Sequence, residues 1–377
     1  MSDSAVVTGA TRERTPSSPE GIRLLRIHHL ELWVGNAKQA AYFYRKCFGF
    51  DQVAYRGPET GCHDRASYAL RQGNIVIVLT SPLTHLDPMN VWLSCHGDGV
   101  RDIAFEVTDA ARAYDLAVAR GAAPVQAPHD LEAADGVVRR AAVRTYGDTI
   151  HSFVERGSYD GFLPGYVVDI ERGHNVGIHC IDHVVGNVEI ERMQHWCDFY
   201  TEVFDFHQFV SYDDKDICTD YTALQSKVMA NTDRSVKFPI NEPAPGLKKS
   251  QIQEYIDFNL TAGVQHIALR TENILETIDI LRDNGAEFLE VPDSYYELIW
   301  DRVGDIEEDR GRVRDLRILV DRDDKGYLLQ LFTRPLQDRP TLFLEVIQRA
   351  GSDSFGKGNF QALFEAIERE QARRGNL

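Results

Sequence analysis

The 377-residue sequence lacks several features that would assign it to a class directly. It has no run of 18 or more apolar residues, so we expect no membrane-spanning helix. Its six cysteines form no Cys-x-x-Cys pair, which favours reduced thiols in a cytoplasmic protein over structural disulfides. Residues 1–22 lack the apolar core of a secretory signal, and we expect them to form a disordered lead-in.

Positive charge is also scarce. The sequence has 41 Lys and Arg against 58 Asp and Glu, for a formal net charge of −17. Such a surface repels phosphate backbones and anionic headgroups, so we expect neither nucleic acid nor a membrane as a partner. A local pocket can still attract an anionic small molecule against this overall field. The 43% of hydrophobic residues is enough for a core in each of two domains.

An internal repeat divides the chain into similar units. A shift of 164 residues aligns 99–128 with 263–292 without a gap, so that "GVRDIAFEV" matches "GVQHIALRT". In both copies an amphipathic stretch follows, which begins at a Thr suited to capping and stops before Gly121 or Gly285. A second repeat relates 27–36 to 181–190, again followed by a helix-like stretch and further strands.

These repeats predict an α+β fold of four strand–helix–strands modules, two in each half of the chain. Paired modules of this kind can close an open barrel whose concave face holds a site. Turn residues cluster in 157–177, where the periodicity lapses. We therefore expect an N-terminal domain at 23–156, a linker at 157–177 and a C-terminal catalytic domain at 178–377.

Three residues of the C-terminal half could hold a metal. His183 and His266 lie on the first strands of its two modules, and Glu345 is a lone carboxylate in the apolar strand "TLFLEVIQ". Two imidazoles and one carboxylate are the ligands of non-haem Fe(II) oxygenases. Each residue also has an ordinary explanation, as a hydrogen-bonded core histidine or as an acid paired with an arginine.

The N-terminal half retains at most part of this set. His29 matches His183, but Asp102 replaces His266, and Ser152 falls opposite Glu345. The difference favours a single metal site in the C-terminal half. The sequence offers no reason why Asp102 stands at its position.

Several motifs together resemble the 4-hydroxyphenylpyruvate dioxygenase family, whose vicinal oxygen chelate fold consists of four βαβββ modules forming two open, barrel-like domains. They are "VKFPINEP" (236–243), "KKSQIQEY" (248–255), "PDSYYEL" (292–298), "FLEVIQR" (343–349) and "FGKGNFQALFEAIE" (355–368). The resemblance implies that Fe(II) is bound by His183, His266 and Glu345. It implies polar substrate contacts at Ser226, Asn241, Gln251, Gln265 and Gln330, and an aromatic pair around the substrate ring at Phe332 and Phe360. It also implies a C-terminal lid helix hinged at Phe355 and Asn359.

The resemblance implies that a 2-oxo acid, 4-hydroxyphenylpyruvate, and O₂ are converted to homogentisate and CO₂ in tyrosine catabolism, by a homo-oligomer. One alternative is 4-hydroxymandelate synthase, which uses the same substrate and metal but hydroxylates the benzylic carbon. The aromatic side chain of Phe360 favours the dioxygenase. A second alternative is a non-catalytic protein of the same fold that binds small molecules, and the presence of all three ligands argues against it.

Overall fold

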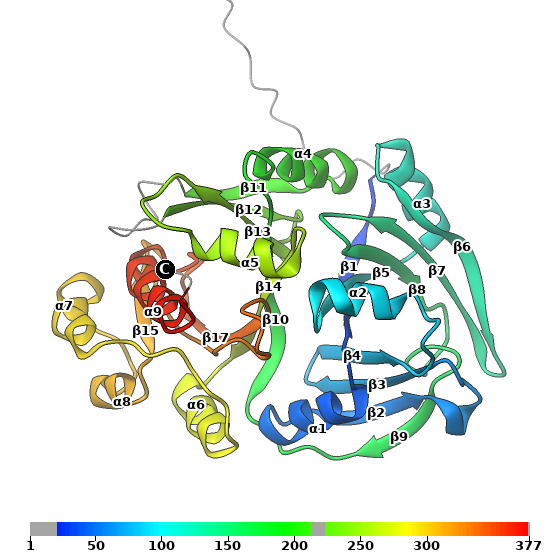
Figure 1. Cartoon of the computed structure of the whole chain (residues 1–377), viewed down its shortest axis with the longest axis horizontal. Helices are drawn as coiled ribbons and strands as arrows, with labels where there is room; N and C mark the ends of the chain where they lie inside the picture. Colours follow the sequence, from blue (N-terminus) through cyan, green and yellow to red (C-terminus); the bar gives the residue numbers. More distant parts are fainter. Residues whose placement is uncertain (1–20, 213–222, 376–377) are drawn as a thin grey trace, which may run out of the picture.

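The computed structural model describes residues 21–212 and 223–375, which form two halves side by side, each built on one curved sheet (Figure 1). The expected lead-in falls almost entirely on residues 1–20, which lie outside the described residues, as does Cys218. The other five cysteines are free thiols, as expected. Within the described residues, every helix is too short or too polar to cross a membrane.

The N-terminal half contains two βαβββ modules. The first consists of β1 (Leu24–Trp33), α1 (Ala37–Cys47), β2 (Asp51–Arg56), β3 (Arg65–Gln72) and β4 (Ile75–Pro82), with the 3-10 turn η1 (Pro58–Thr60) after β2. The second consists of β5 (Gly99–Val107), α3 (Ala110–Ala119), β6 (Pro124–Ala133), β7 (Gly136–Arg144) and β8 (Ile150–Glu155). Helix α2 (Met89–His96) connects the two modules, and β9 (Val167–Glu171) follows them.

The C-terminal half repeats this plan with additional helices. Its modules are β10 (Ile178–Asn187), α4 (Met193–Phe204), β11 (His207–Tyr212), β12 (Ala223–Ala230) and β13 (Lys237–Ala244), then β14 (Gly263–Thr271), α6 (Ile274–Asp283), β15 (Leu319–Arg322), β16 (Tyr327–Phe332) and β17 (Phe343–Ala350). The additions are α5 (Gln251–Asn259), α7 (Asp293–Val303), α8 (Arg310–Asp315), η2 (Lys357–Asn359) and α9 (Phe360–Arg373). This element order confirms the predicted α+β fold of four βαβββ modules.

In each sheet the two modules meet along an antiparallel pair of first strands. The strand orders are β6-β7-β8-β5-β1-β4-β3-β2-β9 and β11-β12-β13-β10-β14-β17-β16-β15. The central pairs are β1 with β5 and β10 with β14, and each of these strands also pairs in parallel with the last strand of its own module. A βαβββ unit leaves its first strand with a free edge, so joining two such edges completes the sheet.

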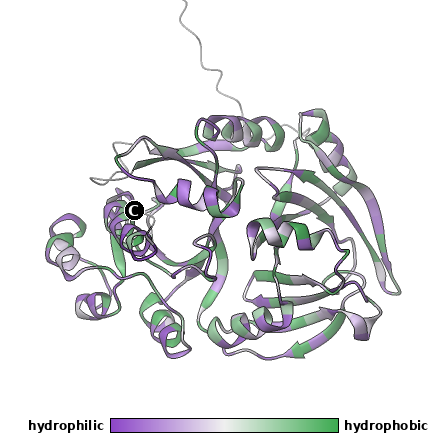
Figure 2. Cartoon of the chain, viewed as in Figure 1, coloured by the Kyte–Doolittle hydropathy of each residue, from purple (hydrophilic) through white to green (hydrophobic). Residues whose placement is uncertain are grey.

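The repeated aromatic residues form the core between helix and sheet. Phe48 and Phe50 after α1, Phe204 at the end of α4 and Phe206 after it are all buried. Hydrophobic and hydrophilic residues alternate along the helices and strands, as Figure 2 shows. The expected glycines end α3 and α6, where Gly121 and Gly285 have positive φ, but the capping side chains are Asp109 and Asn273 instead of threonines.

The segment 157–177, expected to be a linker, belongs in large part to the N-terminal sheet. Strand β9 pairs with β2 at the sheet edge. Before it, Tyr159 and Leu163 pack in one cluster with Val138 and Val154. The segment therefore covers the inner side of this sheet, a packing that its turn-rich composition did not indicate.

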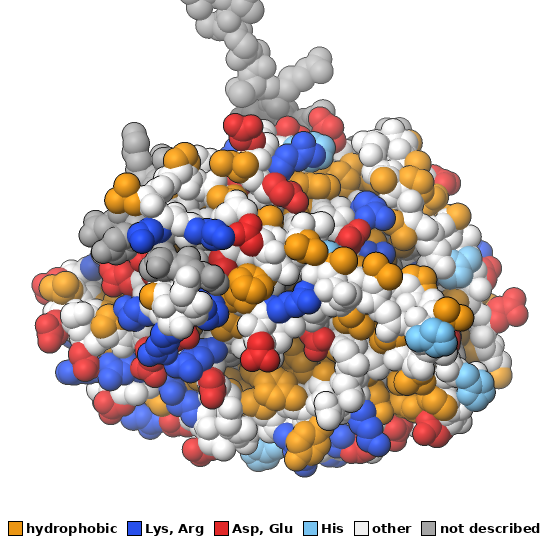
Figure 3. All heavy atoms as spheres, in the orientation of Figure 1, with side chains coloured by type: hydrophobic (Ala, Val, Ile, Leu, Met, Phe, Trp, Pro, Cys, Tyr) orange, Lys and Arg blue, Asp and Glu red, His pale blue; other side chains and the backbone are white. Residues whose placement is uncertain are grey.

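Charged side chains of both signs cover the visible face, and Lys and Arg gather near α8 at its lower left (Figure 3). Their partners are acidic: Arg310 pairs with Asp305, and Arg317 with Asp293, both at 2.7 Å. Arginine charge at this place is therefore largely balanced within the protein.

The two halves touch closely at Gly147, and this contact generates a test of their packing. Gly147 has φ +56°, and an added Cβ would overlap the carbonyl oxygen of Ala262 in the other half. We expect Gly147→Ala to lower the free energy of unfolding by about 2–4 kcal/mol, from backbone strain and the clash together. Chemical denaturation followed by circular dichroism measures the loss.

Gly157→Ala is the matched control, because Gly157 has φ +54° but its nearest neighbour, the Val137 carbonyl oxygen, lies at an ordinary 3.7 Å. It should cost only the strain, about 1–2 kcal/mol. Equal losses in the two variants would show that the contact between the halves does not constrain this loop.

Candidate metal centre

The three predicted metal ligands meet on adjacent strands of the C-terminal sheet. His183 is on β10, His266 on β14 and Glu345 on β17. The Nε2 atoms of His183 and His266 lie 3.2 and 3.3 Å from the same oxygen, Oε2 of Glu345. Two donors bound at right angles to one transition-metal ion, each about 2.1 Å from it, lie about 3 Å apart. The residues present therefore fit a single ion held on one side, with open positions opposite.

Each imidazole is oriented by the side chain that precedes it in the sequence. His183 Nδ1 lies 2.8 Å from a carboxylate oxygen of Asp182, and His266 Nδ1 lies 3.0 Å from the amide oxygen of Gln265. Both partners accept hydrogen bonds, so Nδ1 carries a hydrogen and Nε2 is the nitrogen directed at Glu345. Histidines that bind metals usually have their other ring nitrogen held by an acceptor in this way.

The charge on Asp182 is balanced at the back of the site. Arg349 donates two hydrogen bonds to its carboxylate, both at 2.8 Å, and the ammonium group of Lys237 lies 3.3 Å away. Desolvation by burial opposes ionisation, but His183, Arg349 and Lys237 hold the pKa of Asp182 well below its usual value. The negative charge that faces the metal position therefore comes from Glu345.

The buried charges of the site favour a cation beside Glu345. Burial alone would raise the pKa of Glu345, but the two imidazoles lower it to about 2, so the carboxylate is ionised at neutral pH. Burial lowers the pKa of His266, which favours the neutral ligand form. Burial also opposes protonation of His183, but Glu345 and Asp182 together raise its pKa. A cation at this position would compensate the buried carboxylate.

A cavity of about 60 Å³ adjoins the three ligands. Its walls are mostly apolar, and its polar groups come from the predicted substrate residues Ser226, Asn241, Gln251 and Gln265. The predicted aromatic residues Phe332 and Phe360 and the hinge residue Phe355 also line it. Seven of the predicted residues outside the metal set thus share one cavity with the ligands.

Gln330 and Asn359 lie outside this lining. Gln330 is buried on β16, where its amide fills the space that a Cβ on Gly356 would need. Asn359 accepts a hydrogen bond of 2.7 Å from the Tyr295 hydroxyl of α7. Gln330 therefore contacts the segment that leads into α9, and Asn359 anchors the end of that segment to α7.

Helix α9 lies over the cavity. Its residues Leu363, Phe364 and Ile367 form part of the lining. Before the helix, the ring of Phe355 packs edge-on against His183 at 5.1 Å between centroids. Small-molecule sites usually have volumes of about 300 Å³ or more. The cavity in this structure is smaller than that, because side chains of α9 occupy one of its walls.

Sequence reasoning missed Asp182, Arg349 and Phe343. The ring of Phe343 stacks on His266 at 4.9 Å between centroids. Phe343 precedes Glu345 by two residues on one strand, so alternation would have placed both on one face. Alternation would not have found Asp182, because adjacent residues of a regular strand face opposite sides. The bulge between Ile181 and His183 allows the Asp182 carboxylate to reach the imidazole of His183.

The N-terminal half has a corresponding cluster in which an arginine supplies the positive charge. His29, Glu31 and Asp102 place potential ligand atoms within 4.8 Å of one another. Arg140 Nη2 lies 2.7 Å from the carboxylate of Asp102 and 4.0 Å from that of Glu31. The Ser152 hydroxyl donates to Asp102 at 2.5 Å. Asp102, for which the sequence gave no reason, is thus the buried partner of a guanidinium.

The chain matches the family model described as the Glyoxalase/Bleomycin resistance protein/Dioxygenase superfamily over residues 26–145 and 180–331. It is also similar to curated proteins named 4-hydroxyphenylpyruvate dioxygenase. The protein from Danio rerio is 50% identical over 375 residues, covering 95% of this chain and 94% of the relative. The protein from Aspergillus fumigatus is 49% identical and covers 93% of each. The protein from Yarrowia lipolytica is 46% identical and covers 100% of each.

A solved structure is similar over nearly the whole chain. It is a triple mutant of 4-hydroxymandelate synthase from Streptomyces coelicolor, with a TM-score of 0.83 and 32% identity. The match covers 92% of this chain and 99% of that one.

The arginine-filled cluster generates a stability test. Arg140→Met leaves the fully buried carboxylate of Asp102 without its cation, and we expect the free energy of unfolding to fall by about 3–5 kcal/mol. The double variant Arg140→Met/Asp102→Asn removes the fully buried charge as well, leaves only the more exposed Glu31 without the arginine, and should recover more than half of that loss. Urea denaturation measures both. A double variant as unstable as the single one would refute the ion-pair explanation.

Proposed function

The chain belongs to the 4-hydroxyphenylpyruvate dioxygenase family, and from this membership we propose that His183, His266 and Glu345 hold its catalytic Fe(II). The enzyme converts 4-hydroxyphenylpyruvate and O₂ to homogentisate and CO₂. One observation carries the proposed ligand set: the two buried Nε2 atoms converge on one carboxylate oxygen of Glu345. The Nδ1 atoms of the same rings are hydrogen-bonded to the side chains of Asp182 and Gln265. An ion held by these three residues would keep one side open to the substrate.

Ferrous iron held by His183, His266 and Glu345 would supply open positions for the 2-oxo acid and for O₂ and would pass electrons from the substrate to O₂. The overall reaction balances without another co-substrate. One oxygen atom of O₂ ends in the carboxylate formed as CO₂ leaves, and the other becomes the new ring hydroxyl while the side chain migrates. The substrate therefore serves as its own 2-oxo acid.

The chain's own residues bind the substrate and exclude water. Ser226 and Asn241 stand opposite each other on β12 and β13, and Gln251 begins α5 beside them. We assign these groups to hydrogen bonds with the polar ends of the substrate. Phe332 and Phe360 enclose its ring, and α9 closes over it, so that the reacting atoms are held together in a dry site.

The alternative of 4-hydroxymandelate synthase is less well supported. The similar structure of that enzyme is 32% identical to this chain, whereas the dioxygenases reach 46–50% over comparable lengths. The bulky ring of Phe360 projects into the cavity from the first residue of α9 and packs at 5.2 Å from the ring of Tyr212. A wall of this kind favours presentation of the substrate ring to the oxidant over presentation of its benzylic carbon.

Two expectations from the sequence remain predictions: a cytoplasmic location and a homo-oligomeric state. The oligomeric state is measured by sedimentation of the purified protein. Absence of nucleic-acid and membrane partners remains an expectation from the net charge of −17.

Product identity is the direct test of this function. We expect the Fe(II)-loaded protein, incubated in air with 4-hydroxyphenylpyruvate, to release homogentisate and CO₂ in equal amounts. Homogentisate and 4-hydroxymandelate are isomers, so proton NMR or chromatography against standards must identify the product. Hydroxymandelate would keep the proposed metal site and refute the role given to Phe360. Absence of turnover and of bound iron would favour the non-catalytic alternative.

Removal of a ligand tests the proposed iron site. His183→Ala or His266→Ala should lose bound iron and turnover together, since two remaining donors cannot hold the ion in the open geometry. His29→Ala is the matched control, because His29 occupies the corresponding strand position in the other half. That control should keep one iron per chain by metal analysis. Full iron content in the His183 variant would exclude it as a ligand.

A further inference from the structure

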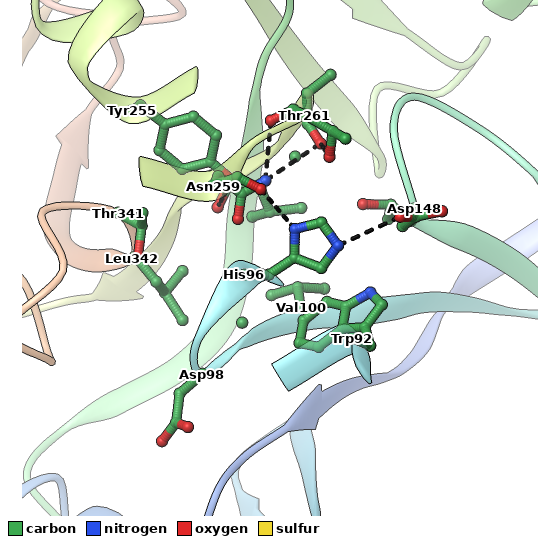
Figure 4. Close-up of a pocket in the computed structure, with 15 residues that line it drawn as sticks. Trp92, His96, Asp98, Val100, Asp148, Tyr255, Asn259, Thr261, Thr341 and Leu342 are labelled. Carbon is green, nitrogen blue, oxygen red and sulfur yellow. Dashed lines mark hydrogen bonds and ion pairs between the residues drawn. The ribbon is translucent and has the colours of Figure 1, made fainter. Parts of the chain in front are cut away.

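The C-terminal end of α2 and the turn after it, residues 94–98, reach from the N-terminal half into the half that holds the proposed iron site. Figure 4 shows the His96 ring between Asn259 on one side and Asp148 on the other. Its Nδ1 lies 2.5 Å from the backbone carbonyl oxygen of Asn259, where α5 ends. Its Nε2 lies 3.2 Å from a carboxylate oxygen of Asp148, in the loop between β7 and β8.

Both partners of the His96 ring accept hydrogen bonds. A carbonyl oxygen only accepts, and an ionised carboxylate only accepts. Burial opposes ionisation of Asp148, but Arg144 and His96 lower its pKa, so the carboxylate is charged at neutral pH. The contact with the carbonyl of Asn259 therefore needs a hydrogen on Nδ1. The His96 ring is almost fully buried, and Trp92 packs on it at 4.7 Å between centroids.

The backbone that His96 holds connects two segments of the substrate pocket. Asn259 ends α5, and its side-chain amide donates to the carbonyls of Thr261 and Ala262, at 2.9 and 3.3 Å. These bonds build the tight turn into β14 (Figure 4). Helix α5 begins with Gln251, and β14 carries His266 four residues after this turn. A shift of the turn therefore moves a substrate contact and a proposed iron ligand together.

The same end of α2 also binds the loop that precedes β17, the strand of the third proposed ligand, Glu345. Arg339 donates to the carbonyls of Cys95 and Ser94, at 2.6 and 2.9 Å. Gln337 exchanges two hydrogen bonds with the backbone of Asp98, at 2.6 and 3.0 Å. Both residues lie in the loop between β16 and β17, and β17 carries Glu345. One short segment thus fixes the backbone before two ligand strands.

We propose that His96 is a positioning residue for the iron site. Through the carbonyl of Asn259 it sets the α5–β14 turn, and through that turn the places of Gln251 and His266. This inference rests on the proposed function for its chemical meaning. It gives the half without a metal a defined task, which is to supply the fixed support against which the ligand strands are aligned.

Two amide substitutions separate the two contacts of His96. The amide nitrogen of His96→Asn reaches the place of Nδ1 and can still donate to Asn259, whereas that of His96→Gln reaches the place of Nε2 and can donate only to Asp148. We expect His96→Gln to weaken Co²⁺ binding by up to about 10–100-fold, the range found when the hydrogen-bonded support of a metal ligand is lost. Its kcat should fall by about 10-fold or more while KM changes less. His96→Asn should stay within about threefold of the wild type in each quantity.

Cobalt titration followed by the visible spectrum, and steady-state kinetics on the iron-loaded protein, provide the readouts. Both are made well below the melting temperature of each variant, which circular dichroism establishes first. Wild-type values in His96→Gln, or equal impairment of both variants, would overturn the proposal. Failure of the wild type to turn over 4-hydroxyphenylpyruvate would overturn the proposed function instead, and the cobalt affinities would still test His96.

A measurement on the wild-type protein keeps the inference testable if His96→Gln does not fold. In protein with ¹⁵N-labelled histidine, we expect His96 Nδ1 to carry a hydrogen that exchanges slowly with solvent. A Nδ1 without hydrogen would remove the bond to Asn259 and refute the positioning role.

Discussion

The antiparallel pairing of β10 with β14 is the contact on which the site depends. Its register sets His183 opposite Ala268 and His266 opposite Val185, so the two imidazoles come from positions two residues apart along one face. Strand β17 then pairs in parallel with β14 and brings Glu345 opposite Ala268. All three side chains thus stand on hydrogen-bonded backbone. Sites built on strands hold their geometry more accurately than sites built on loops, and a metal needs that accuracy.

The two halves compensate buried acids in different ways. In the C-terminal half the imidazoles face Glu345 across a position open to an ion, whereas in the N-terminal half Arg140 lies against Asp102. Arg140 on β7 pairs with Val154 on β8, and Gln330 on β16 pairs with Ile347 on β17. Arg140 and Gln330 therefore occupy equivalent positions in the two halves, so the guanidinium of one half stands where the other half has an amide. Arginine keeps its charge at any physiological pH. The N-terminal half therefore has no need of a metal, and its packed interior can serve as support.

Much of the fold could be predicted because duplication repeats its signals. Gly121 and Gly285 end equivalent helices, and buried aromatic residues recur after α1 and α4, so four modules could be recognised. Glu345 could be found because a carboxylate in an apolar strand is costly without a partner. The rest depends on contacts between distant segments. Three such contacts have no local pattern in the sequence. They are the bulge that turns Asp182 toward His183, the packing of 157–177 on the first sheet, and the hydrogen bonds between α2 and the C-terminal half.

The order of the site residues along the chain also determines when the site forms. The proposed ligands occupy positions 183, 266 and 345, and the helix that covers them ends at Arg373. At synthesis rates of about 5–20 residues per second, roughly 10–30 seconds separate the first ligand from the third. During that interval the N-terminal half can already fold, since its own arginine completes its interior. The N-terminal half can therefore be folded well before the growing chain contains all three proposed ligands. Helix α9, which covers these ligands, is synthesised soon after Glu345.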